Sequence, residues 1–340
     1  MDNKERIKNV LEFKPVDRLP ALEWGPWWNK TMDRWRTEGI NSSTPDILWA
    51  KPGMEVTSAA ADIGDALGLD PFRVVWLAIN GPDCPHPQAE GGGIISNVTD
   101  YHKIKPLLYP EPAFDLNYLK KLSIAGRTDG MALWMWIEGF FWGPRKLLGI
   151  EPHLYAFYDQ PELLEEINAD LLAYYQRVLP QLFDIVTPDI LLIAEDLSYN
   201  HGPMLSKESF DRVMAPYYKV LTKLLKSYGI HPMMDSDGDI TQVIPWLYEV
   251  GVEGLGPLER MAGVDVVKIR QQYPDILLLG GFDKTTMHSG EAGVRLEFER
   301  LLPVIKSGGY LLTVDHQTPP ECSLSNYQLY RKLFLEYATF

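Results

Sequence analysis

The sequence is poor in cysteine, lacks an excess of basic residues and has no long apolar run. Cys84 and Cys322 are the only cysteines and lie far apart, so neither a disulfide framework nor a CxxC zinc site is indicated. The formal net charge of -14 argues against binding to nucleic acid or to an anionic membrane, because phosphate groups would repel the chain. A transmembrane helix needs about 18 apolar residues in a row, and the sequence contains no such run. The opening MDNKERIKNVLEFKPVDR also lacks the apolar core of a signal peptide, so we expect a cytoplasmic protein.

What the sequence does contain is a series of strand and helix patterns. A hydrophobic content of 46% in 340 residues is enough for a large core. Apolar segments with strand character occur before helical patterns five times in the second half of the chain, and the predicted strands are 190–196, 231–237, 252–259, 276–284 and 310–316. Two more strands are expected earlier, at 18–24 and 131–139, separated by an irregular insertion rich in Pro and Gly that includes PDCPHPQAEGGG.

Repeated βα units with apolar strands indicate a parallel sheet covered by helices, either a doubly wound sheet or a (β/α)8 barrel. We predict an α/β fold of the (β/α)8 TIM-barrel type, with an irregular insertion after the first strand and one domain over residues 1–340. The barrel is favoured because polar residues gather at the same end of successive strands. In a barrel these carboxyl ends meet at one mouth, where such enzymes carry their active sites.

The polar residues at these strand ends are mostly acidic, and they are Glu195, Asp196, Asp235, Asp237, Glu259, Asp283, Lys284, Asp315 and His316. Asp196 and Asp239 could instead cap the helices that follow them, since Asp accepts hydrogen bonds from free backbone N–H groups. DSDGD is not an EF-hand calcium loop, because that loop needs Gly at position six and Glu at position twelve. Here, counting from Asp235, Gly238 is fourth and Trp246 is twelfth.

Several segments resemble one superfamily. RIKNVLEFKPVDRLP, GFFWGPRKLLG, EDLSYNHGPMLS, DGD with GGFDK, and GGYLLTVDHQTPPECS are similar to uroporphyrinogen decarboxylase, corrinoid-linked methyltransferases and cobalamin-independent methionine synthase. The resemblance extends over nearly the whole chain and implies a (β/α)8 barrel. It also implies one of two different chemistries.

The decarboxylase branch of this superfamily has a pair of arginines just after the first strand, where guanidinium groups hold the carboxylates of a porphyrinogen. In this chain the matching stretch is EWGPWWNKTMDRW, and its first arginine is Arg34. Tryptophans 24, 27 and 28 stand in place of the arginines. The ring of acids would also repel a substrate with many carboxylates.

The methyltransferase branch has a zinc site made of His-x-Cys after one strand and a late Cys, with a Glu 22 residues after the first Cys in methionine synthase. Aligned on Gly238, the resemblance places Asp235 at the His position, Asp237 at the first Cys position, Glu259 at the Glu position and His316 at the late position. Oxygen and nitrogen ligands leave a cation more Lewis-acidic than thiolates do, which suits an ether oxygen better than a thiol. The resemblance therefore implies a divalent metal, with zinc favoured, held by Asp237, Glu259 and His316, with Asp235 as a fourth ligand or a neighbour of the ligands.

The predicted function is a methyltransferase that demethylates a small O-methyl substrate and passes the methyl group to a corrinoid on a separate protein. Glu195 or Tyr199 would protonate or orient the leaving oxygen. His316 would act in catalysis as a ligand of the metal. An apolar wall for the substrate is expected from Trp24, Trp27, Trp28, Trp134, Trp136 and Trp142, although tryptophans on strands also occur in plain cores.

Two other enzyme classes and a binding role stay open. These are a decarboxylase of the uroporphyrinogen decarboxylase type, a magnesium-dependent enzyme that abstracts a proton with Lys284 as base, and a catalytically silent binding protein. For His316 a hydrogen bond to Asp315 is the alternative to metal binding, and His201, His231 and His288 are weaker candidates. A homodimer is also open.

Overall fold

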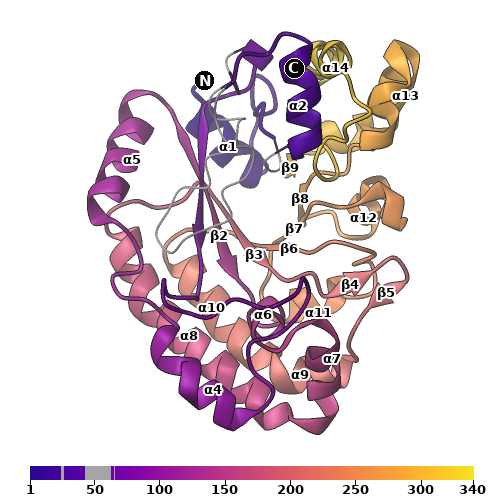
Figure 1. Ribbon diagram of the computed structural model, residues 1–340. Helices are drawn as coiled ribbons and strands as arrows, with labels where there is room; N and C mark the ends of the chain where they lie inside the picture. The colour runs from indigo at the N-terminus through magenta and orange to yellow at the C-terminus, as the bar shows by residue number, and fades with distance from the viewer. Residues whose placement is uncertain (24–26, 43–62, 65) are drawn as a thin grey trace.

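The structure is a computed structural model that describes residues 1–23, 27–42, 63–64 and 66–340. Its centre is a parallel sheet of seven strands in the order β1-β2-β3-β6-β7-β8-β9. Figure 1 shows this sheet curled, with the helices arranged around it. The strands are β1 (Phe72–Leu77), β2 (Ala132–Glu138), β3 (Ile190–Ala194), β6 (Pro232–Asp235), β7 (Gly254–Gly256), β8 (Leu277–Leu279) and β9 (Tyr310–Leu311).

The strands are buried because helices cover the outside of the sheet. All seven residues of β2 and all five of β3 are buried, as expected for parallel strands whose side chains have no solvent on either face. The predictions at 131–139, 190–196, 231–237, 252–259, 276–284 and 310–316 are confirmed as strand positions, each with a shorter strand inside the predicted range. An α/β fold with a parallel sheet is therefore confirmed.

The start of the sheet differs from the prediction. Residues 19–23 of the predicted strand 18–24 form no strand, and Arg18 makes only an isolated bridge to Thr339. The sheet begins instead with β1, which lies inside the segment predicted to be irregular and pairs with β2 from Phe72 to Leu77. Val74, Val75 and Trp76 are typical strand residues, but the Pro- and Gly-rich sequence after them obscured this signal. Within the described residues, no strand pairing joins β1 to β9 to close the sheet.

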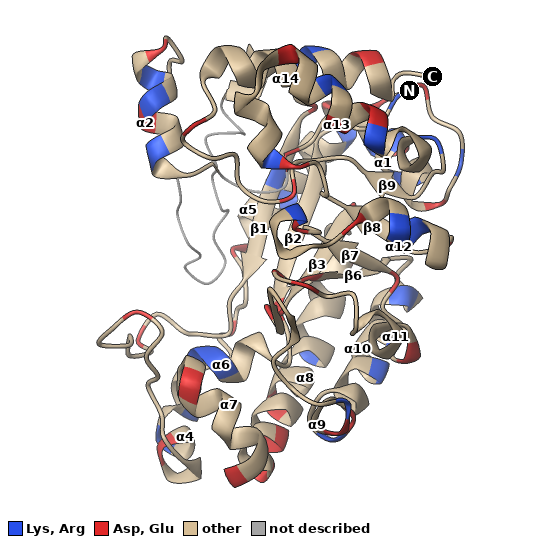
Figure 2. Cartoon of the chain, turned by 90° about the vertical axis from the view of Figure 1, so that its right-hand side faces the viewer, with Lys and Arg blue, Asp and Glu red and all other residues tan. Residues whose placement is uncertain are grey.

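The helices mostly lie in the connections between strands. They are α1 (Asn3–Leu11), α2 (Asn29–Thr37), α4 (Val98–Ile104), α5 (Leu116–Thr128), α6 (Trp142–Leu148), α7 (Ile150–Asp159), α8 (Pro161–Phe183), α9 (Lys207–Val213), α10 (Ala215–Ser227), α11 (Ile244–Glu249), α12 (Val266–Gln272), α13 (Gly290–Ile305) and α14 (Leu324–Ala338). A small hairpin, β4 (Ser198–Tyr199) and β5 (Gly202–Pro203), follows β3. Figure 2 shows acidic and basic residues mixed along α13, as on a solvated helix face. Within the described chain, none of the helices has the combination of length and apolar character that a bilayer crossing requires.

His153 on α7 is a buried imidazole in the core beside α6. Its ring packs edge-on against Phe141, with centroids 4.5 Å apart, and no described residue is hydrogen-bonded to either ring nitrogen. Burial, assisted by the charge of Arg145, lowers the pKa of His153 to about 3. The native imidazole therefore stays neutral in a pH range where the unfolded chain takes up a proton.

We expect acid to destabilise the protein through this group. As pH falls from about 6.5 towards 3, this imidazole takes up a proton only in the unfolded state. This lowers the free energy of unfolding by about 2 kcal/mol at pH 5 relative to pH 7. His153→Leu should remove this component, so the wild-type free energy of unfolding should fall more steeply between pH 7 and 5 than that of the variant. Urea denaturation at several pH values measures both slopes, and equal slopes would contradict the assignment.

Candidate metal centre and adjoining cavity

Asp237, Glu259 and His316 lie just beyond the carboxyl ends of three strands. Asp237 follows β6 by two residues, Glu259 follows β7 by three and His316 follows β9 by five. The sheet continues briefly past the strand ends, since the Ser236 N–H donates to the Gly256 carbonyl at 2.9 Å. Parallel pairing thus brings side chains that are far apart in sequence to one edge of the sheet.

These three side chains form a compact group of possible metal ligands. One ligand atom from each lies within 4.8 Å of the other two. His316 Nε2 lies 3.4 Å from Asp237 Oδ2, and the Gly238 N–H donates to Glu259 Oε2 at 3.1 Å. Asp237 Oδ1 is shielded from solvent, and no donor to it is found in the part of the chain that the structure describes. A buried carboxylate oxygen without a donor, beside a second carboxylate and an imidazole, fits a divalent cation such as zinc.

Gly238 allows the chain to turn directly after Asp237. Its φ of 82° is in the left-handed region, and an added Cβ would lie 2.8 Å from the backbone of Ser198. Only glycine combines this φ with such a close approach at little cost. The loop after β6 is therefore held against the loop after β3, which helps to set the position of Asp237.

Two further carboxylates lie beside this group. Asp235 is buried and accepts a hydrogen bond from Trp136 Nε1 at 2.6 Å, and it is not part of the group of three ligands. Burial raises the pKa of Asp235 well above its usual range, and the nearby Asp237 and Asp196 raise it further. Burial, followed by the charge of Asp237, raises the pKa of Asp196 to about 6. These shifts reflect the cost of gathering several negative charges in a poorly solvated place.

Asp315 holds two of the neighbouring loops. Its fully buried carboxylate accepts hydrogen bonds from the backbone N–H groups of Arg260 at 2.8 Å and Lys284 at 3.2 Å. Burial raises the pKa of Asp315 to about 6. The Lys284 ammonium lies 3.5 Å from Glu259 Oε1 and 3.9 Å from Asp315 Oδ1. Lys284 is thus an ion-pair partner of the acids, in contrast to the free base that proton abstraction would need.

Glu195, predicted to act on the leaving oxygen, lies inside the protein. It is fully buried and accepts hydrogen bonds from the backbone N–H groups of Phe140, Phe141 and Trp142 at 2.7 to 2.8 Å, and from the Tyr218 hydroxyl. Burial raises the pKa of Glu195 to about 7, while the hydrogen bonds act in the opposite direction. The structure therefore favours a role in holding the loop between β2 and α6 over direct contact with substrate.

The tryptophans that were predicted to form one apolar wall do not all lie together. Trp24 lies outside the described residues, and Trp27 is fully buried in the core, with its ring centroid 5.0 Å from that of Trp35. Trp28 is 46% exposed, and its ring centroid lies 6.4 Å from that of His316. The remaining three are Trp134, which stacks on Trp136 with centroids 5.2 Å apart, Trp136 itself, which donates to Asp235, and Trp142, which lines a cavity. Trp27 is thus a core residue and does not replace the arginines of the decarboxylase branch.

The group of three ligands does not include Tyr199, nor the weaker candidates His201, His231 and His288. Tyr199 is 50% exposed on the hairpin after β3, and its carbonyl accepts from the Asp239 N–H at 2.9 Å. Its ring packs edge-on against His201, with centroids 5.7 Å apart. His231 lies at the start of β6 and pairs with Glu253 at 2.6 Å, as expected for a structural residue.

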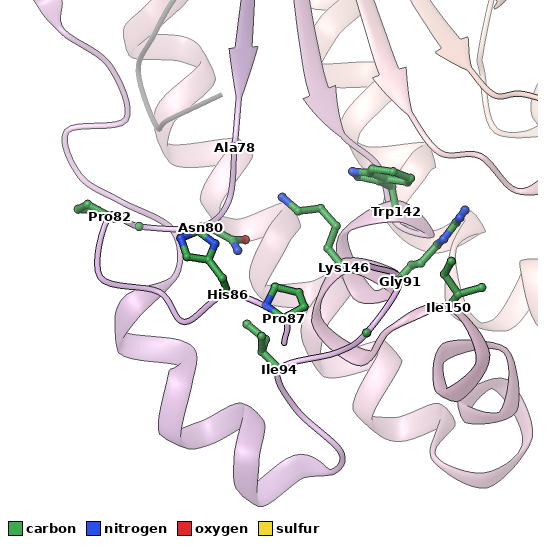
Figure 3. Close-up of a pocket in the computed structure, with 13 residues that line it drawn as sticks. Ala78, Asn80, Pro82, His86, Pro87, Gly91, Ile94, Trp142, Lys146 and Ile150 are labelled. Atoms are coloured by element: carbon green, nitrogen blue, oxygen red, sulfur yellow. The ribbon is translucent and has the colours of Figure 1, made fainter. Parts of the chain in front are cut away.

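A cavity of about 730 Å³ lies between the segment after β1 and α6, and Arg145 in its lining contacts Asp196. Figure 3 shows Asn80 and His86, from the segment after β1, across the cavity from Trp142 and Lys146 of α6. The PDCPHPQAEGGG segment, predicted only as irregular, supplies part of its lining. This volume is within the range of roughly 300–1,000 Å³ that is usual for small-molecule sites.

Sequence reasoning named Asp196 of this region only as a strand-end acid or helix cap, and it missed Arg145. Asp196, for which a helix-capping role was an open alternative, has a positive φ of 49° and accepts from the Asp237 N–H at 3.4 Å. Arg145 was not singled out, although its segment GFFWGPRKLLG was noted for the resemblance. Its Nη1 donates to the Asp196 carbonyl at 3.2 Å, which connects the cavity to the metal group. The strand-end pattern could not find Arg145, because it lies inside a helix.

Comparisons with known proteins agree with this architecture. A curated relative, the methylcobamide:CoM methyltransferase MtbA of Methanosarcina acetivorans, is 21% identical over 302 residues, which are 82% of this chain and 82% of that protein. A solved structure, a methyltransferase from Methanosarcina mazei, superposes with a TM-score of 0.63 at 15% identity and covers 99% of both chains. At this identity the superposition shows a shared fold.

The family assignment rests on the second half of the chain. The model of the family described as "Uroporphyrinogen decarboxylase (URO-D)" matches residues 150–337, more than half of the sequence and the part that contains Asp237, Glu259 and His316. The resemblance to this superfamily is thereby confirmed. The chain belongs to the uroporphyrinogen decarboxylase (URO-D) family.

Proposed function

We propose that the protein is a metal-dependent methyltransferase that removes a methyl group from a small O-methyl substrate and passes it to a corrinoid on a separate protein. The observation that carries the proposal is the group of Asp237, Glu259 and His316 at the carboxyl edge of the sheet. It is supported by the 21% identity to a protein named as a methylcobamide:CoM methyltransferase. Carboxylate and imidazole ligands in place of thiolates favour an ether oxygen over a thiol as the atom to be polarised.

In this proposal Asp237, Glu259 and His316 would hold a divalent metal, with zinc favoured, and Lys284 would balance part of the negative charge through Glu259. The bound cation would supply Lewis acidity towards the substrate oxygen. The bond between this oxygen and the methyl carbon breaks, the oxygen keeps the electron pair and takes up a proton, and the methyl group goes to the reduced corrinoid. Tyr199, half-exposed after β3, is the proposed proton donor, and Trp28 would cover the outer side of His316.

Decarboxylation of a polycarboxylate is less consistent with the contacts of Arg34. Its Nε pairs with Glu38 at 2.7 Å, and its Nη1 donates to the carbonyls of Pro320 at 3.0 Å and Glu321 at 2.8 Å. These bonds occupy the guanidinium that would otherwise hold a substrate carboxylate. The family name therefore does not decide the reaction.

We also propose that the chain forms one domain over residues 1–340 and a complete (β/α)8 barrel, with residues 19–23 at the eighth strand position. The support is one contact with the end of α14 and one with the residue two positions before β1. The Leu19 N–H donates to the Ala338 carbonyl at 2.9 Å, and the Asp70 N–H, just before β1, donates to the Ala21 carbonyl at 2.8 Å. Pro20 has no N–H to donate, which weakens regular pairing there.

The test combines metal analysis with a methyl-transfer assay. We expect about one divalent ion per chain by inductively coupled plasma mass spectrometry after reconstitution and dialysis. The metal-replete protein, mixed anaerobically with cob(I)alamin and a panel of methoxylated aromatics and aliphatics, should convert the cobalt absorbance to that of the methylated form with at least one donor. An unchanged spectrum across the panel, also with added corrinoid protein, would overturn the proposed methyl transfer.

A further inference from the structure

The cavity between the segment after β1 and α6 is lined by two cationic side chains, Lys146 and Arg145, which differ in their ion pairing. Lys146 Nζ lies 2.5 Å from Glu138 Oε1, so its charge is largely balanced by a carboxylate that is fully buried. Arg145 Nη1 donates to the carbonyl of Asp196 at 3.2 Å, while the nearest carboxylate oxygen, Asp196 Oδ2, is 3.9 Å away. A guanidinium has five N–H donors, and with the described residues Arg145 makes one hydrogen bond, so most of its donors face no described partner.

Other polar atoms of the lining also lack partners. Trp142 Nε1 and Asn80 Oδ1 are shielded from solvent, and no described residue is hydrogen-bonded to either atom. Buried polar atoms usually have partners, so a cavity with several unpaired ones is suited to a ligand that supplies them. The Arg145 guanidinium lies over the Trp142 ring, 5.2 Å from its centroid, which fixes the position of the cation.

The walls between these polar groups are apolar. Pro87, Ile94 and Ile150 line the cavity together with the face of Trp142. Figure 3 shows Pro87 and Ile94 near one another and Trp142 apart from them, close to the strand ends. Such a lining suits a flat organic ring with one anionic end, because a ring buries apolar surface and loses little conformational freedom.

Asp196 connects this cavity to the metal group. It contacts Arg145 through its carbonyl, and its carboxylate accepts from the Asp237 N–H at 3.4 Å. A ligand anion beside Arg145 would thus be linked to Asp237 only through Asp196, since no residue of the metal group lines the cavity. This placement separates the negative end of a ligand from the acids of the metal group, which would repel it.

From these observations we infer that the cavity binds the carboxylate of a small methoxylated aromatic acid, with Arg145 as the residue that selects the anion. This inference rests on the proposed function, because the methoxy group would have to reach the metal group. Guanidinium and carboxylate form two parallel hydrogen bonds, so an uncharged analogue of the same shape would lose this recognition.

Calorimetric titration without any corrinoid tests the inference by binding alone. Metal-replete protein is titrated with 4-methoxybenzoate and with 4-methoxybenzyl alcohol, which keeps the ring and the ether but lacks the charge. We expect the benzoate to bind more tightly, and Arg145→Gln to weaken its binding about 10- to 100-fold while changing that of the alcohol less than about threefold. Arg145→Lys, which keeps the charge but not the paired donors, should lose less affinity than Arg145→Gln.

Arg212→Gln is the matched control, since Arg212 is a half-exposed residue of α9 that pairs with Glu162 and Glu165 of α8, and its loss should leave benzoate binding unchanged. Thermal melts establish that each variant is folded. Equal affinity of the wild-type protein for the two ligands, or an equal loss of both in Arg145→Gln, would overturn the inference. Tight, Arg145-dependent binding of the benzoate without methyl transfer would support the anion site and count against the proposed reaction, so the two failures are distinguishable.

Discussion

Replacing Asp237 by asparagine is expected to lower the rate of methyl transfer by about 10²- to 10³-fold, as for the loss of one group that stabilises a developing oxyanion. Bound metal should fall well below one ion per chain after dialysis. Asp237 Oδ1 is shielded and has no donor among the described residues, and Oδ2 lies 3.4 Å from His316 Nε2, so both oxygens are close to where a cation would bind. Asparagine keeps the shape of the side chain but removes its charge.

The control for this variant is Asp239→Asn, two residues along the same loop. Asp239 accepts from the Thr241 N–H at 3.0 Å, a local cap that asparagine can also provide. We expect Asp239→Asn to keep its metal and its activity. Metal content by mass spectrometry and initial rates with cob(I)alamin measure both variants. Full metal retention in Asp237→Asn, or the same loss in Asp239→Asn, would contradict the assigned ligand.

Replacing Glu195 by glutamine is expected to lower the free energy of unfolding by about 1–3 kcal/mol, because at least one of the three buried backbone N–H groups loses its acceptor. Glu195 Oε2 accepts from Phe141 N at 2.7 Å and from Trp142 N at 2.8 Å. In glutamine one of the two oxygens becomes an NH2 group, which cannot accept. With the NH2 group in place of Oε1, the Phe140 N–H loses its acceptor, while the Tyr218 hydroxyl can accept from the NH2 group. The site has no space to rearrange, since an added Cβ on Gly139 would lie 2.1 Å from Glu195 Cδ.

Glu162→Gln provides the surface comparison. The Glu162 side chain is 76% exposed and pairs with Arg212, so little change in stability is expected. Urea denaturation of the wild-type protein and both variants measures the difference. If Glu195→Gln is as stable as Glu162→Gln, then the carboxylate does not hold the loop in the way that the hydrogen bonds indicate.

The second half of the fold could be predicted from the sequence because its strands are buried on both faces. Stretches such as ILLIA of β3 are apolar throughout, and each is followed by a helical pattern. The first part was misread for a local reason. Residues 72–77 form β1, but the Pro- and Gly-rich segment after them resembles a long loop. Residues 19–23, in contrast, have a strand-like sequence but form no strand. Pairing depends on neighbours that are distant in sequence, and a local pattern does not contain them.

In the candidate site, too, some features could be predicted from the sequence and others depended on distant parts of the chain. The sequence by itself determined which residues end the strands, and the spacing of Asp237, Glu259 and His316 matched a family pattern, so these three could be named without a structure. Only the tertiary structure decided that Asp235 turns to Trp136, that Glu195 and Trp27 are buried, and that Arg145 reaches Asp196 beside a cavity. The physical reason is that a parallel sheet fixes where strand ends meet, while the direction of each side chain depends on packing and hydrogen bonds with segments that are remote in the chain.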